Sequence, residues 1–411
     1  MRLLFFVEPA VFREDPHFLV PHLEWVAGLV RTSSAGSACF ALASSPALCG
    51  ALAEQAPDVG PRVAKYPLDS FGATASSGYR RLGYASALYG DGHGPCALKS
   101  TLETVRREFA PDCVVLTSQN AIAEQAFAGL PMLRMEQAPL PRAGHPLRFC
   151  LDPCGHQVGS VLEVQAQAIR NLSLDPAVRA GLTRLLHDVR QRAATADERN
   201  VRALAELATL RQHGRLALLA MQPPDWITYE GALYPIEPEG LLMSWADSLP
   251  QGWVGVPTYH PTWRLPRPME CVLADSTDRL RFLPGDLAQG TTEALLTLAD
   301  GFVTISSSAA MTALLFGKHA VVTGKSPYAS WCPREVVALK DSATFSEQEA
   351  TSVLAFLCNR YVHRADRLFT EPGYLESLLS ALYSSGDPAA SLLNLDVLSI
   401  EGSRALFALG D

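Results

Sequence analysis

Three consecutive serines, Ser306, Ser307 and Ser308, are the residues of this chain whose types and spacing point most directly to chemistry. A β-branched and aromatic run at residues 302–305 precedes them and predicts a buried strand, and good helix formers follow at residues 309–316. Hydroxyl groups at a helix start lie beside backbone N–H groups and the positive end of the helix dipole, a geometry that binds phosphate. The serine turn, residues 306–308, is therefore a predicted phosphate site; the simpler alternative is an ordinary capped helix.

Polar residues also follow the other predicted strands in the second half of the chain. They are Asp225, His260 with Pro261, and the loop residues Lys325, Ser326 and Tyr328. Loops after the carboxyl ends of parallel strands build ligand sites, so these residues are expected to share one edge of a sheet. Asp225 offers a carboxylate, while His260 and Lys325 offer hydrogen bonds to phosphate oxygens. Each also has an ordinary explanation, as a cap, a turn residue or a solvated surface lysine.

Two carboxylates stand at strand ends in the first half of the chain. Glu136 follows an apolar run at residues 132–135, and Asp152 follows another at residues 148–151. Taken singly, each is explained by a structural role. Taken together with Asp225, they offer an acid/base or nucleophile set facing one cleft.

Two series of alternating strands and helices are expected to position these residues. Strands are expected at residues 3–7, 38–43, 114–117, 132–135 and 148–151, and again at 216–221, 252–256, 280–283, 302–305 and 320–323. Helices are expected at residues 21–30, 47–55, 98–109 and 121–128, and again at 240–247, 292–299, 309–316, 346–359, 374–383 and 403–409. Such alternation favours an α/β fold with parallel, doubly wound sheets.

The pattern divides the chain into two domains and a tail. Residues 1–205 form the expected first domain, closed by a stretch at 160–205 that is helical throughout. Residues 206–385 form the second domain, and residues 386–411 form a helical tail. Two doubly wound units in sequence imply a cleft between them, with ligands near the carboxyl ends of the strands.

Length, composition and charge narrow the class of protein. A chain of 411 residues with 48% hydrophobic and 18% charged residues is typical of a globular protein of two or three domains. A net charge of −8 argues against a general nucleic-acid binder. No apolar run approaches the length of about 18 residues that a membrane span needs. The nine cysteines are scattered without zinc-type spacing, and the apolar start is interpreted as a strand rather than a signal peptide.

The second domain resembles GT-B glycosyltransferases that use CMP-sugars. The closer likeness is to bacterial transferases that add β-linked Kdo, 3-deoxy-D-manno-oct-2-ulosonic acid, to capsule polysaccharide and lipopolysaccharide. Their Ser/Thr turn, ALL-x-GK helix end, strand and G-x-x-x-Y-A loop are similar to SSSAAMTALLFGKHAVVTGKSPYASW here. Their Q…D loop is similar to Gln222 to Asp225, and their HP to His260-Pro261. The clear match spans about residues 215–332, and a weaker one in the first domain includes Glu136 and Asp152.

The resemblance implies a GT-B fold of two Rossmann-like domains facing a central cleft, with a helical linker and C-terminal helices. It implies transfer of Kdo from CMP-β-Kdo to a saccharide of a bacterial surface polysaccharide, such as capsule or O-antigen, with retention through a carboxylate nucleophile. The implied catalytic residues are Asp225 as nucleophile and Asp152 or Glu136 as acid/base. The implied CMP-phosphate residues are His260, Pro261, Ser306, Ser307, Ser308, Lys325, Ser326 and Tyr328. Arg142 or Lys325 would hold the Kdo carboxylate, and no metal or other cofactor is expected.

The implied partners are a CMP-sugar donor and a lipid-linked glycan acceptor, with other transferase domains as a further option; nucleic acid is not expected. The expected location is cytoplasmic, peripheral at the inner membrane. Three alternatives stay open. One is a sialyltransferase-like or other CMP-ulosonate transferase, the second is a non-catalytic sugar-nucleotide-binding or scaffold module of a polysaccharide assembly complex, and the third is a GT-B-like sugar epimerase that prefers UDP.

Overall fold

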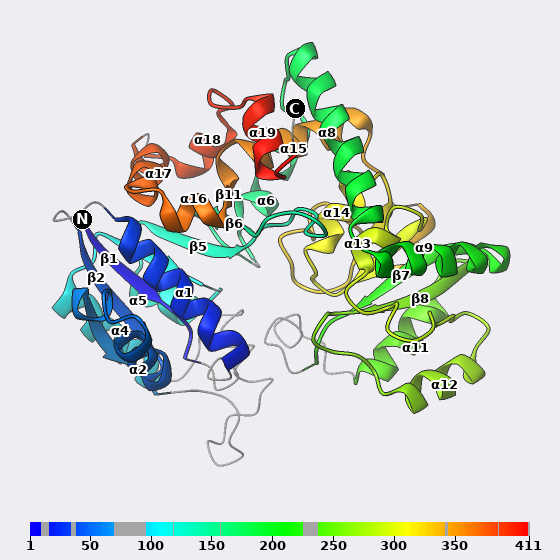
Figure 1. Ribbon diagram of the computed structural model, residues 1–411, viewed down its shortest axis with the longest axis horizontal. Helices are drawn as coiled ribbons and strands as arrows, with labels where there is room; N and C mark the ends of the chain where they lie inside the picture. Colours follow the sequence, from blue (N-terminus) through cyan, green and yellow to red (C-terminus); the bar gives the residue numbers. More distant parts are fainter. Residues whose placement is uncertain are drawn as a thin grey trace. The chain divides into compact units, whose positions relative to one another are not determined.

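The computed structural model divides the chain into two compact units (Figure 1). It describes residues 1–9, 16–33, 38–69, 96–117, 119–156, 158–224, 237–341, 344–384 and 386–409. Unit 1 consists of Met1–Gln137, Leu147–Val161 and Tyr361–Asn394. Unit 2 consists of Ala138–Pro146, Leu162–Arg360 and Leu395–Asp411.

This division differs from the expected boundaries at residues 205 and 385. The helices that follow residue 161 pack with unit 2 instead of closing the first domain. The chain returns to unit 1 at Tyr361, because the short strand Val362–Arg364 pairs antiparallel with Arg148–Asp152. Backbone pairing over more than 200 residues of sequence therefore sets these boundaries.

Unit 1 is built on a sheet with the order β11-β6-β5-β4-β1-β2-β3, seven strands among the described residues. The strands are β1 (Arg2–Phe6), β2 (Cys39–Ser44), β3 (Val63–Pro67), β4 (Cys113–Leu116), β5 (Met132–Gln137), β6 (Arg148–Asp152) and β11 (Val362–Arg364). β1 to β5 run parallel, and β6 is antiparallel to both β5 and β11. The chain moves outward in both directions from β1, so this sheet is doubly wound.

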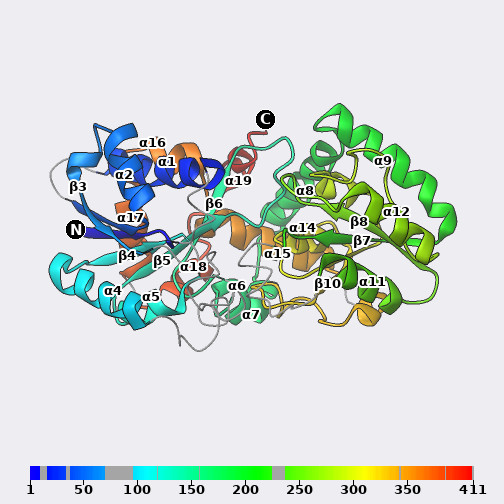
Figure 2. The same ribbon diagram turned by 90° about the horizontal axis from the view of Figure 1, so that it is seen from below.

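Helices cover both faces of this sheet. They are α1 (Pro16–Thr32), α2 (Pro46–Gln55), α4 (Cys96–Phe109), α5 (Ala121–Ala126), α16 (Ala365–Thr370), α17 (Tyr374–Tyr383) and α18 (Pro388–Leu393). Figure 2 shows α1, α2 and α16 on one face and α4 and α5 on the other. Aromatic contacts fix the first face to the sheet: the Phe149 ring of β6 lies 4.8 Å from Trp25 of α1 and 5.5 Å from Phe369 of α16.

Unit 2 is built on a parallel sheet with the order β10-β9-β7-β8, four strands in the described part of the chain. The strands are β7 (Arg215–Met221), β8 (Trp253–Tyr259), β9 (Gly301–Thr304) and β10 (His319–Val322). The chain moves from β7 to β8 on one side and then to β9 on the other, so this sheet is also doubly wound. The expected strand at residues 280–283 does not join it: Leu280 makes only an isolated bridge to Gly255.

Helices also cover both faces of the second sheet. They are α6 (Val161–Val164), α7 (Ala166–Arg170), α8 (Pro176–Thr195), α9 (Glu198–Leu210), α11 (Pro238–Ser248), α12 (Arg267–Ser276), α13 (Thr292–Leu295), α14 (Ala309–Leu315), α15 (Glu347–Phe356) and α19 (Ile400–Leu406). Figures 1 and 2 both show α9 on one side of β7 and β8 and α11 on the other. Two doubly wound, mainly parallel α/β units confirm the predicted fold class.

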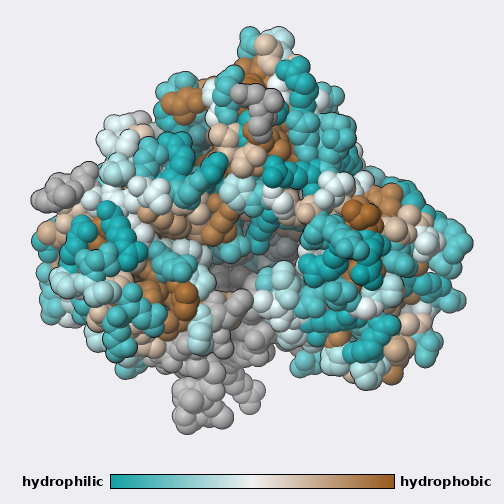
Figure 3. All heavy atoms as spheres, viewed as in Figure 1, coloured by the Kyte–Doolittle hydropathy of each residue, from teal (hydrophilic) through white to brown (hydrophobic). Residues whose placement is uncertain are grey.

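The face of unit 2 that Figure 3 shows is largely hydrophilic, with small separate hydrophobic patches. The exposed large apolar side chains of unit 2, such as Val201, Val272 and Val337, belong to different elements. None of the helices in the described part of the chain has both the length and the apolar character that crossing a bilayer requires.

Candidate functional site

The loops that follow the strands of unit 2 meet at the carboxyl edge of its sheet. Gln222 follows β7, the serine turn follows β9, and Lys325 comes shortly after β10. Because the strand order reverses at β7, the loops after β7 and β9 flank the point where doubly wound sheets bind ligands. The structure thus places the serine turn and Lys325 at the carboxyl edge of the sheet, where ligand sites of doubly wound sheets lie.

The Gln222 side chain joins the loops after β7 and β9. Its Oε1 accepts a hydrogen bond from the Ser306 backbone N–H at 3.0 Å, and its Nε2 donates to the Ser306 Oγ at 3.2 Å. Ser306 is only 6% exposed, so this pair fixes the base of the serine turn. Gln222 opens the segment that resembles the Q…D loop of Kdo transferases, but it was not among the predicted site residues.

Ser307 and Ser308 are arranged differently from the expected helix cap. The Ser307 Oγ accepts from the Ala309 backbone N–H at 3.3 Å, and the Ser308 Oγ accepts from the Arg142 guanidinium at 2.8 Å. Ser308 is the N-cap residue of α14, but its side chain does not cap the helix. A hydroxyl that accepts a hydrogen bond keeps its proton, so both serines retain a donor for an anion.

The backbone at the start of α14 is largely engaged. The Ala310 and Met311 N–H groups donate to the Ser307 and Ser308 carbonyl oxygens, each at 3.0 Å. Fewer backbone donors are therefore left for an anion than the helix start alone would provide. The serine hydroxyls and the nearby cations are therefore the main groups left to bind an anion at the turn.

Arg142 reaches the serine turn from the connection between β5 and β6. This segment, Ala138–Pro146, belongs to unit 2 although both strands belong to unit 1. The Glu293 carboxylate on α13 fixes the segment, since its Oε2 accepts from the backbone N–H groups of Arg142 at 2.6 Å and Ala143 at 2.8 Å. Sequence reasoning placed Arg142 in the first domain; in the structure its side chain contacts Ser308 within unit 2.

The loop after β10 lies beside the serine turn. The Gly324 N–H donates to the Ile305 carbonyl at 2.8 Å, which places Lys325 and Ser326 beside the turn. Ser326 is 2% exposed, and its Oγ accepts from the Tyr328 N–H at 3.2 Å. Lys325 is half-buried, and its ammonium makes no hydrogen bond or ion pair with any residue that the structure describes.

His260 stands at the end of the neighbouring strand β8. Its Nδ1 accepts from the Thr262 backbone N–H at 3.2 Å and lies 2.8 Å from the Thr262 Oγ1. An accepting Nδ1 requires that a neutral ring carry its proton on Nε2, the tautomer that donates from the other side of the ring. The Pro261 carbonyl is bound by the Gln289 amide at 2.7 Å, which fixes this turn.

The predicted nucleophile, Asp225, lies outside the described residues. Among the residues that are described, no three His, Cys, Asp or Glu side chains gather in a way that would hold a metal ion. The polar groups at the carboxyl edge are hydroxyl, amide, imidazole and cationic groups, which bind anions.

Asp152 in unit 1 is buried and fully engaged. Its Oδ1 accepts from the backbone N–H groups of Cys154 at 2.7 Å and Gly155 at 3.0 Å. Its Oδ2 accepts from the Val161 N–H and the Tyr361 hydroxyl, both at 2.9 Å. Burial raises the pKa of the Asp152 carboxyl above its ordinary value, and these hydrogen bonds oppose the rise. The arrangement favours a structural role, holding the loop after β6.

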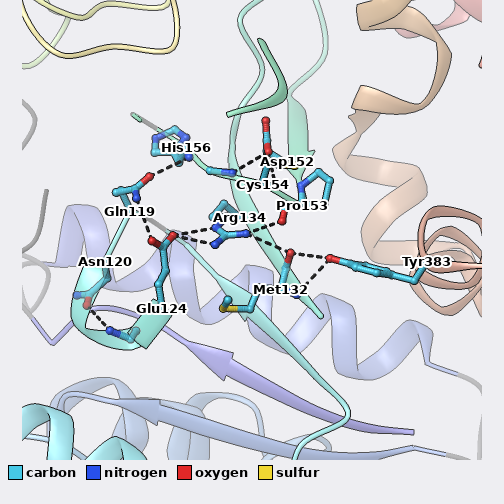
Figure 4. A network of polar contacts seen from close by, with 12 residues as sticks. Gln119, Asn120, Glu124, Met132, Arg134, Asp152, Pro153, Cys154, His156 and Tyr383 are labelled. Atoms are coloured by element: carbon cyan, nitrogen blue, oxygen red, sulfur yellow. Dashed lines mark hydrogen bonds and ion pairs between the residues drawn. The ribbon is translucent and has the colours of Figure 1, made fainter. Parts of the chain in front are cut away.

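Glu136, on the neighbouring strand β5, has different surroundings. Its side chain is 39% exposed, and its Oε2 lies 3.5 Å from the His156 Nε2. The His156 backbone N–H donates to the Gln119 Oε1 at 2.9 Å, a contact shown in Figure 4. Sequence reasoning missed His156, whose only signal was its place four residues after Asp152. The structure thus pairs Glu136 with His156 and not with Asp152.

A buried ion pair supports the loop that carries His156. Arg134 is 4% exposed; its Nη2 lies 2.9 Å from the Glu124 Oε1, and its Nη1 donates to the Pro153 carbonyl at 2.7 Å. Figure 4 shows Arg134 between these partners, with Gln119 linking Glu124 to His156. This network ties the loop after β6 to α5 and β5.

Comparison with known proteins finds distant similarity to solved structures. No protein-family model matches the chain, and no curated protein matches it. KpsC of Thermosulfurimonas dismutans provides two similar structures. Its β-Kdo 2,7-transferase is 13% identical over 88% of this chain and 92% of that chain, with a TM-score of 0.45. Its β-Kdo 2,4-transferase is 17% identical over 66% of this chain and 87% of that chain, with a TM-score of 0.37.

A UDP-GlcNAc 2-epimerase from Neisseria meningitidis is also similar. It is 12% identical over 95% of this chain and 97% of that chain, with a TM-score of 0.29.

Proposed function

We propose that this chain is a glycosyltransferase that binds a CMP-activated ulosonic acid at the carboxyl edge of the sheet in unit 2. The observation that carries the proposal is the meeting of the serine turn, Arg142 and Lys325 at that edge, with His260 after β8. Hydroxyl, imidazole and cationic donors together suit a nucleotide phosphate and a sugar carboxylate. The motif resemblance of residues 215–332 supports Kdo as the sugar and a bacterial surface polysaccharide as the acceptor.

The chemistry of the leaving group fits these residues. CMP departs as a phosphate monoester, so the reaction needs stabilisation of the phosphate charge more than a strong general acid. The serine hydroxyls and the Nε2–H of His260 would donate to its oxygens, and loss of one such donor typically costs about 3 kcal/mol. The proposed reaction uses no metal.

A carboxylate nucleophile accounts for retention. In the first step an oxygen of Asp225 bonds to the anomeric carbon as the bond from that carbon to the phosphate oxygen of CMP breaks, and CMP leaves. In the second step the acceptor hydroxyl oxygen displaces Asp225 and gives its proton to a base. Glu136 suits that base better than Asp152, because both oxygens of Asp152 are occupied by donors from the described residues.

The acceptor is proposed to be a lipid-linked glycan. Such an acceptor would be met by peripheral contact with the cytoplasmic face of the inner membrane. Transfer to a water-soluble saccharide with no effect of added vesicles would contradict this part of the proposal.

Calorimetric titration with different nucleotides tests the donor. We expect CMP and CMP-Kdo to bind and UDP-GlcNAc not to bind. Preference for UDP-GlcNAc would favour an epimerase, turnover of CMP-sialic acid would favour another ulosonate transferase, and binding of CMP-Kdo without product would favour a non-catalytic module.

An Asp225→Asn variant tests the nucleophile. It should bind CMP with unchanged affinity but transfer no Kdo, because the amide cannot form the glycosyl ester. Wild-type turnover by this variant would refute the assignment of Asp225.

A further inference from the structure

Glu293 binds the backbone of Arg142 and not its side chain. The Glu293 Oε2 accepts hydrogen bonds from the N–H groups of Arg142 at 2.6 Å and Ala143 at 2.8 Å. The Arg142 Nη2 donates instead to the Ser308 Oγ at 2.8 Å. The carboxylate of Glu293 therefore fixes the main chain at this arginine, and the guanidinium is left to the serine turn.

A second anchor holds the same segment further along the chain. The His145 Nδ1 donates to the Phe407 carbonyl at 3.0 Å, and the two rings meet edge to face with their centroids 5.1 Å apart. Between the anchors, a Cβ atom on Gly144 would lie 3.3 Å from the Arg192 Cγ of α8. α13, α8 and the chain after α19 thus hold the backbone that carries Arg142, and all of these belong to unit 2.

Arg142 itself is exposed, and its guanidinium keeps most of its donors. A guanidinium has five N–H groups, and hydrogen bonds within the described residues engage one of those of Arg142. A long side chain loses conformational freedom when it binds a ligand, and less freedom is lost when the backbone beneath it is already fixed. The anchored segment therefore presents Arg142 to an anion at the serine turn.

The negative charge of Glu293 opposes an anion at this place. Glu293 lies within one arginine side chain of the serine turn, so its carboxylate repels a phosphate or carboxylate bound there. If repulsion were its only effect, removing the carboxylate would strengthen anion binding. If Glu293 acts by holding Arg142, removing it would weaken anion binding. The two effects have opposite signs, so the direction of the change identifies the role.

We propose that Glu293 is a positioning residue of the donor site, which holds Arg142 at the serine turn so that the guanidinium binds an anionic group of the CMP-ulosonate. This inference rests on the proposed function. The phosphate and the carboxylate of such a donor are attached to the same carbon atom, so one guanidinium beside the serine turn reaches either group. A fork of parallel N–H donors suits both.

Calorimetric titration of the full chain with CMP and with CMP-Kdo tests the role of Glu293. Arg142→Ala should weaken binding of CMP-Kdo about tenfold, and Glu293→Ala should weaken it by a similar factor. The double variant should bind within about twofold of the weaker single variant, because both changes remove the same contact with the donor. Either variant's loss for CMP as well would identify the phosphate as the group that Arg142 binds, and a loss for CMP-Kdo alone would identify the carboxylate; both results support the role of Glu293.

Two further variants separate positioning from general effects of charge and packing. Glu293→Gln keeps an oxygen acceptor for the two N–H groups, so its affinity for CMP-Kdo should stay within about threefold of the wild type. A loss as large as that of Glu293→Ala would contradict positioning by these hydrogen bonds. Glu206→Ala is the matched control: it removes an exposed carboxylate from α9, which packs against α13, and should change no affinity. Thermal unfolding of each variant shows whether it is folded at the temperature of the titration.

The outcomes separate this inference from the proposed function. Unchanged or stronger binding of CMP-Kdo by Glu293→Ala would overturn the inference, and so would losses that add up in the double variant. Unchanged binding by Arg142→Ala would overturn it too, because Glu293 would then have no ligand-binding group to position. In each of these cases, binding of CMP-Kdo by the wild type would leave the proposed function intact. A wild-type chain that binds neither CMP nor CMP-Kdo would refute the proposed function itself.

Discussion

The loop after β6 in unit 1 and the carboxyl edge of the sheet in unit 2 are both rich in polar side chains, but they use them differently. In the first, Asp152 accepts hydrogen bonds on both oxygens, and Arg134 is paired with Glu124. In the second, among the described residues, the Arg142 side chain donates to a serine hydroxyl and pairs with no carboxylate, and Lys325 has no partner.

The difference separates structural from ligand-binding polar clusters. A buried polar group costs free energy unless the protein satisfies it, so the loop after β6 is internally satisfied and stabilises the fold. Cations left without carboxylates at an accessible edge contribute little to folding and are available for an anion. Substitutions in the first cluster should therefore change stability, and substitutions in the second should change binding.

The largest effect is expected for Asp152. Asp152→Ala removes the acceptor of three backbone N–H groups and the Tyr361 hydroxyl, so it should lower the free energy of unfolding by about 3 kcal/mol or more. Glu136→Gln, on the adjacent strand and partly exposed, should change it by no more than about 0.5 kcal/mol. Urea denaturation measures both. Full stability of Asp152→Ala together with lost transfer would make Asp152 catalytic and break the comparison.

Substitution of Gln222 is expected to reduce CMP affinity more than it reduces stability. Gln222→Ala removes both contacts to Ser306, which frees the serine turn, so the affinity for CMP should fall about tenfold, or about 1.4 kcal/mol. The free energy of unfolding should fall by about 1 kcal/mol. Calorimetry and urea denaturation on the same preparation give both numbers. A loss of stability without a loss of CMP affinity would show that the Gln222–Ser306 pair stabilises the fold and does not support a phosphate site.

Lys318 provides a matched cation at the opposite edge, just before β10. Burial, with Arg190 nearby, lowers the pKa of Lys318 to about 8. Between pH 8 and the ordinary lysine pKa of about 10.4, the unfolded chain binds a proton that the folded chain has released, so wild-type stability should rise with pH across that range. Below pH 8 the full penalty of the buried charge remains.

Lys318→Met should remove that penalty. Because the side chain is partly exposed, the gain at neutral pH is expected to be only about 1 kcal/mol, and the difference between variant and wild type should shrink as the pH rises above 8. CMP affinity should not change, whereas Lys325→Met should weaken it. Thermal unfolding at several pH values and CMP titration test this. Equal losses of CMP affinity in the two variants would remove the distinction between the edges.

Much of the fold could be predicted because buried parallel strands are continuous apolar runs. The expected strand at residues 216–221 became β7 (Arg215–Met221) for this reason. An apolar run predicts burial rather than pairing, however. Leu280 and Leu283 are buried as expected, yet residues 280–283 do not form a strand of the sheet.

Features that depend on distant pairing could not be predicted. β11 has only three residues, too few for a periodic pattern, and it exists through its pairing with β6. The same limit applies to Arg142, because no local signal shows that Ala138–Pro146 packs with unit 2.

The candidate site was predictable where it follows strand ends. That rule places the serine turn and His260 at one edge, because the carboxyl ends of parallel strands lie together there, and their role in binding stays a prediction. The rule could not show that both carboxylate oxygens of Asp152 accept hydrogen bonds within unit 1, because those donors come from later parts of the chain.

Titration of the wild-type chain and of a Ser307→Ala/Ser308→Ala variant with CMP, followed by calorimetry, tests most directly whether the carboxyl edge of unit 2 binds a nucleotide phosphate. We expect one CMP to bind per wild-type chain and the affinity of the variant to be lower by about tenfold or more, with an unchanged midpoint of unfolding. No binding by the wild type, or equal affinity in the variant, would contradict the account.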